Sequence, residues 1–151
     1  MKRRLYRIPA VAMLSCAALF GAATSAKATN PTLHFSKVYV NSPGTDTGTN
    51  SSLNAEYAVI SNSSYTTVYT LTGYTISDKS GHVFKFPTFK LNARASVRVH
   101  TGTGVNTSTN LYWRSKAYIW TNTGDTAYLK NTAGTLKDSC TWGSVASYVT
   151  C

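Results

Sequence analysis

The chain has 151 residues, with fifteen Lys and Arg against five Asp and Glu, a formal net charge of +10 and three cysteines. This length suits one domain, and so few carboxylates argue against glycosidase chemistry, which needs two of them across a cleft. The positive charge favours anionic surfaces such as wall polymers, phospholipid or nucleic acid.

The first 28 residues have the layout of a secretory signal peptide. Four basic residues lie within the first seven positions, an apolar run spans residues 8–23, and Ala26-Lys27-Ala28 follows as a cleavage motif. The apolar run is shorter than the ~20 residues that a membrane-spanning helix needs. We therefore expect export and removal of residues 1–28, which leaves one secreted domain of residues 29–151, with attachment to the cell wall left open. The alternative is a lipoprotein in which Cys16 is lipidated.

Cleavage changes both the charge and the cysteine count. Five of the fifteen basic residues lie within residues 1–28, so ten remain against all five acids and the net charge falls to +5. Two cysteines remain, Cys140 and the final residue, Cys151. In an oxidising compartment an isolated pair predicts a disulfide, which would pin the C-terminal tail. A two-ligand metal site is the alternative, but the sequence offers no His-x-His and no second cysteine pair.

After residue 28, short β-rich segments alternate with Gly, Asn, Ser, Thr and Pro, and no helical periodicity is sustained. This pattern predicts an all-β sandwich or barrel, with hairpin turns at residues 79–81 and 131–134 and long polar loops at 41–54 and 100–110. The expected strands are 33–40, 56–62, 67–71, 74–78, 82–87, 96–101, 117–120, 126–131 and 135–142.

The segment 56–62 is apolar on nearly both sides, because Tyr57 and Val59 oppose Ala58 and Ile60. We expect it at the centre of a sheet, covered on both faces. The expected core residues are Tyr57, Val59, Ile60, Leu71, Tyr74, Ile76, Phe84, Phe86, Val97, Val99, Ile119, Trp120, Leu129 and Cys140.

Several segments, taken in order, resemble the lamin tail domain as found in secreted bacterial proteins. They are NAEYAVISN, LTGYTISDKSGHVFKFP, SVRVHTGTG, LYWRSKAYIWTNTGDTAYLKN and GTLKDSCTW, and together they cover roughly residues 30–142. The resemblance implies an immunoglobulin-like antiparallel β-sandwich. The family aromatic after Leu-x-Gly is commonly Trp and is Tyr74 here. No catalytic residues of the family carry over.

Glu56 is the only glutamate and lies in a predicted strand, where carboxylates are disfavoured. A carboxylate among apolar neighbours must be paired or hydrogen-bonded, since an isolated buried charge is costly. We expect Glu56 to accept hydrogen bonds from backbone N–H groups or hydroxyls of a neighbouring loop. Asp78 and Asp125 are expected to be similar structural anchors, because Asp125 follows Gly124 in a turn.

A basic stretch lies between Asp78 and Asp125, where seven Lys and Arg occur without an acid. Arg94, Arg98 and His100 share one parity and would line one outward face if that parity extends through residues 94–96. Such a face would dock a polyanion; the alternative is scattered solubilising charge. The candidate polyanion contacts are Arg94, Arg98, His100, Arg114 and Lys116.

Nucleic acid is not an expected partner, because the stretch lacks aromatic residues interleaved with the charges, unless Tyr112 and Trp113 are exposed beside Arg114. No enzyme motif is present, and the three histidines lie on separate predicted strands without zinc-ligand spacing. Two oxygens from Asp46 and Asn50 are too few for calcium. We therefore expect no cofactor and no metal.

The expected function is non-catalytic, with the ligand unknown. One class is an extracellular or cell-envelope interaction or adhesion module that binds protein or glycan, indicated by exposed aromatics such as Tyr112, Trp113 or Tyr118 near the long loops. The second class is a polyanion binder that uses the basic face. An enzyme would require a cleft with convergent carboxylates and histidine.

Overall fold

A computed structural model describes residues 31–151, so the predicted signal peptide of residues 1–28, Cys16 included, lies outside the described residues. Nearly all regular structure is strand. The elements are β1 (Leu33–Tyr39), α1 (Asn50–Asn54), β2 (Tyr57–Asn62), β3 (Tyr69–Thr70), β4 (Thr75–Ser77), β5 (Val83–Lys85), β6 (Lys90–Leu91), β7 (Ser96–His100), β8 (Asn110–Tyr112), β9 (Asp125–Lys130), β10 (Leu136–Trp142) and β11 (Tyr148–Thr150). Within residues 31–151 no helix has the length and apolar character needed to span a bilayer.

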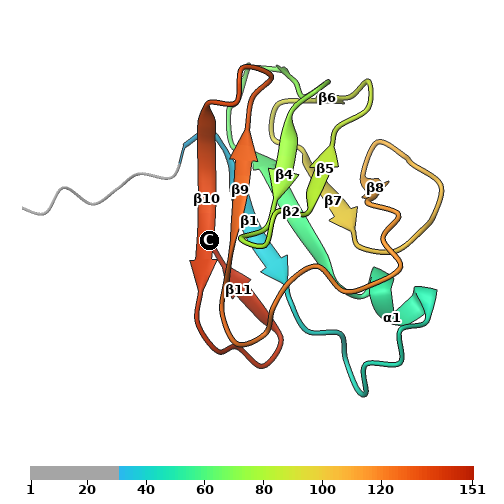
Figure 1. Cartoon of the computed structure of the whole chain (residues 1–151). Helices are drawn as coiled ribbons and strands as arrows, with labels where there is room; N and C mark the ends of the chain where they lie inside the picture. The colour runs from blue at the N-terminus through green and yellow to red at the C-terminus, as the bar shows by residue number, and fades with distance from the viewer. Residues whose placement is uncertain (1–30) are drawn as a thin grey trace, which may run out of the picture.

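Two sheets stack face to face (Figure 1). One has five strands in the order β11-β1-β2-β7-β8 and the other has four in the order β10-β9-β4-β5, which lies in front in the figure. Neighbouring strands are antiparallel except β7 and β8, which are parallel. A short β3–β6 pair completes the fold. The predicted immunoglobulin-like β-sandwich is confirmed.

The core lies between the two sheets. On β2 the inward residues are Ala58 and Ile60, which pair with Val99 and Val97 of β7, and all four side chains are buried. The three tryptophans also pack in or against this core. They make consecutive edge contacts, Trp113 to Trp120 and Trp120 to Trp142, each at 5.8 Å between ring centroids. Large aromatic area of this kind contributes much of the stability of a small domain.

The prediction that Tyr57 and Val59 belong to the core is wrong. Both side chains are half-buried and lie on the opposite face of β2, which points away from the other sheet. The alternation of residues along β2 could not show which face points to the core, because both faces of this strand carry apolar residues. The inward face is set instead by the register with β7, which places Ile60 opposite Val97.

Other elements also differ from the prediction. Residues 117–120 form no strand, because the amides of Ile119 and Trp120 donate to the Glu56 carboxylate and not to a neighbouring strand. The loop 41–54 ends in the short helix α1, capped by the Thr49 hydroxyl. Strands β6, β8 and β11 were not predicted; the latter two have three residues each, too few for alternation to be visible.

The disulfide between Cys140 and Cys151 is present, with its Cα atoms 5.5 Å apart. It ties β10 of one sheet to the residue that follows β11 of the other. The tail is therefore attached covalently as well as by the pairing of β11 with β1.

Replacing both Cys140 and Cys151 with Ser is expected to lower the free energy of unfolding by about 3 kcal/mol, since the cross-link restricts the unfolded chain. Urea denaturation followed by tryptophan fluorescence measures this loss. Reduction of the wild type should give the same loss, and an unchanged denaturation midpoint in both experiments would contradict a stabilising role for the bond.

Candidate functional site

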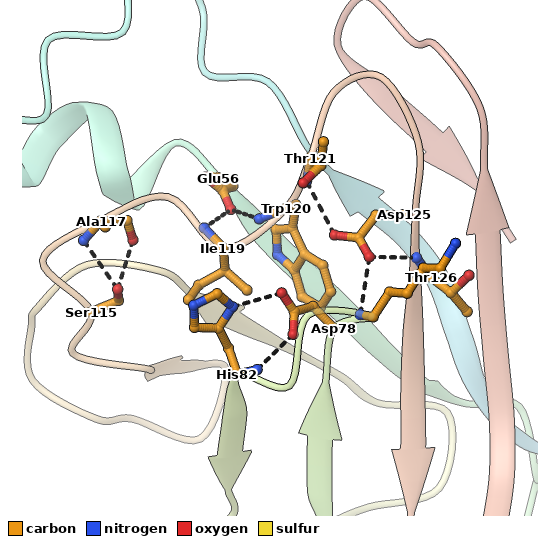
Figure 2. A network of polar contacts seen from close by, with 11 residues as sticks. Glu56, Asp78, His82, Ser115, Ala117, Ile119, Trp120, Thr121, Asp125 and Thr126 are labelled. Atoms are coloured by element: carbon orange, nitrogen blue, oxygen red, sulfur yellow. Dashed lines mark hydrogen bonds and ion pairs between the residues drawn. The ribbon is translucent and has the colours of Figure 1, made fainter.

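Glu56 lies directly before β2 and is fully buried. Its Oε1 accepts hydrogen bonds from the backbone N–H groups of Ile119 (2.9 Å) and Trp120 (2.6 Å). Figure 2 shows these two bonds, which join the start of β2 to the irregular segment between β8 and β9. The second oxygen, Oε2, is buried as well, and the buried hydroxyl of Thr101 is a further polar neighbour of this carboxyl group.

Burial raises the pKa of Glu56 from 4.5 to about 7. The amide hydrogen bonds from Trp120 and Ile119 and the neighbouring Thr101 hydroxyl act in the opposite direction, and the charge of Asp46 adds to the rise. A raised carboxyl pKa is also found in catalytic acids. Glu56, however, does not line the nearby cavity of about 230 Å³, whose wall includes Asp46, Tyr118 and Trp120.

Three of the four aspartates also bind backbone amides. Asp125 accepts from the N–H groups of Thr126 (2.7 Å), Lys79 (3.0 Å) and Thr121 (3.2 Å), as Figure 2 shows. Asp78 accepts from the N–H of His82 and lies 2.6 Å from its ring Nδ1. Asp138 of β10 accepts from the N–H of Phe35 in β1 at 2.7 Å and so links the two sheets.

This use of the carboxylates leaves the basic side chains without acidic partners. Within residues 31–151 the one ion pair that involves an Asp or Glu side chain is His82 with Asp78, and no Lys or Arg pairs with such a side chain. The described residues also contain no group of three or more His, Cys, Asp or Glu side chains that could hold a metal ion. The candidate binding groups of residues 31–151 are therefore Lys and Arg side chains that no Asp or Glu side chain neutralises.

One face of the five-stranded sheet points away from the four-stranded sheet, and we call it the outer face. It carries one aromatic ring from each of its five strands. Register aligns them in one row, the aromatic row, which consists of Tyr148, Tyr39, Tyr57, His100 and Tyr112. Successive ring centroids are 5.0, 4.6, 5.1 and 5.2 Å apart. The interplanar angles are 34°, 27°, 50° and 20°, so Tyr39 stacks on Tyr57 and His100 stacks on Tyr112, while the other two pairs are tilted.

The next positions along the strands form two further rows. Lys37, Val59 and Arg98 pair in register across β1, β2 and β7 and are called the cationic row. Beyond it, the hydroxyls of Ser36, Ser61 and Ser96 are linked by hydrogen bonds of 2.8 Å and are called the hydroxyl row.

A groove of about 580 Å³ runs over these rows. Its floor is Val59, with Lys37 and Arg98 on either side. Both cations also contact the aromatic row: the Lys37 Nζ lies 4.3 Å from the ring centroid of Tyr148, and the Arg98 guanidinium lies 5.6 Å from that of Tyr57. Burial, together with the neighbouring Tyr39, raises the pKa of the Tyr57 phenol, whereas Arg98 lowers it.

The predicted polyanion contacts do not form one surface. Arg98 and His100 point to the outer face as expected, but both ring nitrogens of His100 lie within hydrogen-bond distance of oxygens of Asn54 and Asn110. The parity does not extend to Arg94, which lies in a turn at φ 61° over the ring of Tyr65.

The two remaining contacts of that set lie in the segment after β8. Arg114 has φ 67° and donates to the Gly104 carbonyl, and Lys116 is exposed. Lys37, which lies across Val59 from Arg98, was missed. Its pairing depends on strand register, which no local sequence pattern reveals.

Comparison with known protein families shows which family the chain belongs to. The family profile described as Lamin Tail Domain matches residues 26–144, which is most of the chain. The chain belongs to the lamin tail domain family. This is a non-enzymatic, immunoglobulin-like family, in agreement with the sandwich described above. A search of curated proteins finds no match to this lamin tail domain.

Substituting Glu56 with Gln should remove a pH dependence of stability. Because the pKa of Glu56 is about 7 in the folded state and 4.5 as the ordinary value, folding is favoured most below pH 4.5, and this contribution is lost as the pH rises to about 7. Gln keeps an oxygen that can accept from Ile119 and Trp120 but does not ionise. The wild type should therefore lose about 3 kcal/mol relative to Glu56→Gln between pH 4.5 and pH 8.

The measurement is urea denaturation of both proteins across this pH range. All other ionisable groups are the same in both proteins, so their effect cancels in the difference. A difference in unfolding free energy that stays constant with pH would show that Glu56 is not a buried carboxyl of raised pKa.

Proposed function

We propose that this lamin tail domain is exported and acts without catalysis as a binding module, holding an anionic polymer on the outer face of its five-stranded sheet. The observation that carries the proposal is the cationic row: Lys37 and Arg98 flank an apolar floor, and neither pairs with an Asp or Glu side chain of residues 31–151. Two cations beside a groove, neither neutralised by an Asp or Glu side chain of residues 31–151, suit a ligand that supplies negative charge.

Export is supported by the sequence of residues 1–28 and by the disulfide, since such bonds persist in oxidising compartments. The absence of catalysis is supported by the carboxylates, four of which hold backbone amides. General acid–base chemistry needs a group that can reach the proton it transfers, and Glu56 is fully buried. An association with the cell wall follows if the polymer belongs to that wall.

A general adhesion module built on exposed aromatics near the loops has weaker support. Tyr112 and Trp113 are half-buried: Tyr112 stacks on His100, and Trp113 packs on Phe84 and Trp120. Tyr118 is half-buried as well, and its hydroxyl bonds to Ser52 of α1. Each of these rings therefore already has a partner within the described residues.

Arg98→Glu is expected to weaken retention on phosphocellulose strongly, because it reverses one charge of the cationic row. Lys130→Glu is the matched control: it makes the same change in net charge, but on β9 of the other sheet. Wild-type and Lys130→Glu proteins should elute at higher salt than Arg98→Glu. Equal elution of the two variants would mean that retention reflects net charge alone, against a specific outer face.

A further inference from the structure

We propose that the polymer is an acidic polysaccharide, whose carboxylates bind Lys37 and Arg98 while its hydroxyl groups bond to the hydroxyl row. This inference rests on the proposed function and narrows it to one ligand class. It starts from two neighbouring rows of the outer face. The cationic row offers two charges with the apolar Val59 between them, and the hydroxyl row lies beside it.

The aromatic row argues against single-stranded nucleic acid. Binding of that kind requires open ring faces on which successive bases stack. Here Tyr39, Tyr57 and His100 each have a ring neighbour on both sides. At one end of the row Gly104 lies so close to Tyr112 that an added Cβ would clash with the ring, leaving Tyr148 as the exposed end ring.

A lipid surface is also a poor occupant. Binding at a membrane interface buries large apolar side chains. The most exposed ones among residues 31–151, Tyr65 and Val105, do not line the groove, and Val59, which does line it, is half-buried.

A polysaccharide with carboxylates fits the cationic row and the hydroxyl groups beside it. The guanidinium of Arg98 is exposed and can bind a carboxylate through two N–H groups, while the Lys37 ammonium supplies a point charge on the other side of Val59. Val59 offers contact for the C–H surface of a sugar ring. Ser36, Ser96 and Thr109 line the groove with hydroxyls, which donate and accept as sugar hydroxyls require.

The test is binding of the purified exported protein to soluble polygalacturonate, measured by isothermal titration calorimetry at low and physiological salt. Methyl-esterified polygalacturonate is the matched ligand, with the same sugar backbone and no charge, and inorganic polyphosphate supplies charge without sugar. We expect binding to polygalacturonate that weakens with salt, at least tenfold weaker binding to the ester, and weaker binding to polyphosphate.

Variants locate the site. Arg98→Gln and Lys37→Gln should each weaken polygalacturonate binding about tenfold, whereas Lys130→Gln should not. Ser36→Ala combined with Ser96→Ala should weaken binding to polygalacturonate but leave binding to polyphosphate unchanged, because the hydroxyl row contacts sugar and not charge. Circular dichroism of each variant establishes that it is folded.

The outcomes separate the two proposals. If polyphosphate binds as tightly as polygalacturonate and the serine variant has no effect, the polysaccharide is excluded while the anionic binding face stands. If neither polymer binds, both proposals fail. Binding that no variant of Lys37, Arg98 or the serines weakens would place the polymer elsewhere and overturn the groove as its site.

Discussion

The pair of hydrogen bonds from Ile119 and Trp120 to Glu56 is the constraint on which much of this domain depends. Residues 117–120, in the segment between β8 and β9, form no strand, so the amides of Ile119 and Trp120 have no strand neighbour to donate to, and a buried amide without an acceptor is costly. The carboxylate supplies that acceptor. It thereby holds the backbone of Trp120, whose ring packs between those of Trp113 and Trp142.

The same principle governs three aspartates and shapes the outer surface. Asp78, Asp125 and Asp138 are used on backbone amides within and between the sheets. Few acids remain to neutralise the ten Lys and Arg that follow residue 28. The carboxylates that hold the backbone inside the domain are therefore the same ones that do not neutralise the cations of the outer face.

The sequence predicts well those features that depend on neighbouring residues. The hairpin turns place Gly81 and Gly134 at φ 97° and 78°, where glycine is needed, and the cysteine pair forms the expected bond. Prediction from the sequence fails where a residue's contact lies far away in the chain. The aromatic row takes one residue from each of five strands, and the amides of Ile119 and Trp120 pair with a side chain more than sixty positions earlier in the chain. Register and tertiary hydrogen bonds decide both, and neither leaves a periodic signal.

The central claim is that the outer face, and not the loops, is the binding surface of this lamin tail domain. It is tested most directly by titrating the isotope-labelled protein with short galacturonic acid oligomers and following its amide NMR signals. The account predicts that the largest shifts occur at Lys37, Val59 and Arg98. Shifts confined to the loops 41–54 and 100–110, with the three central strands unchanged, would contradict it.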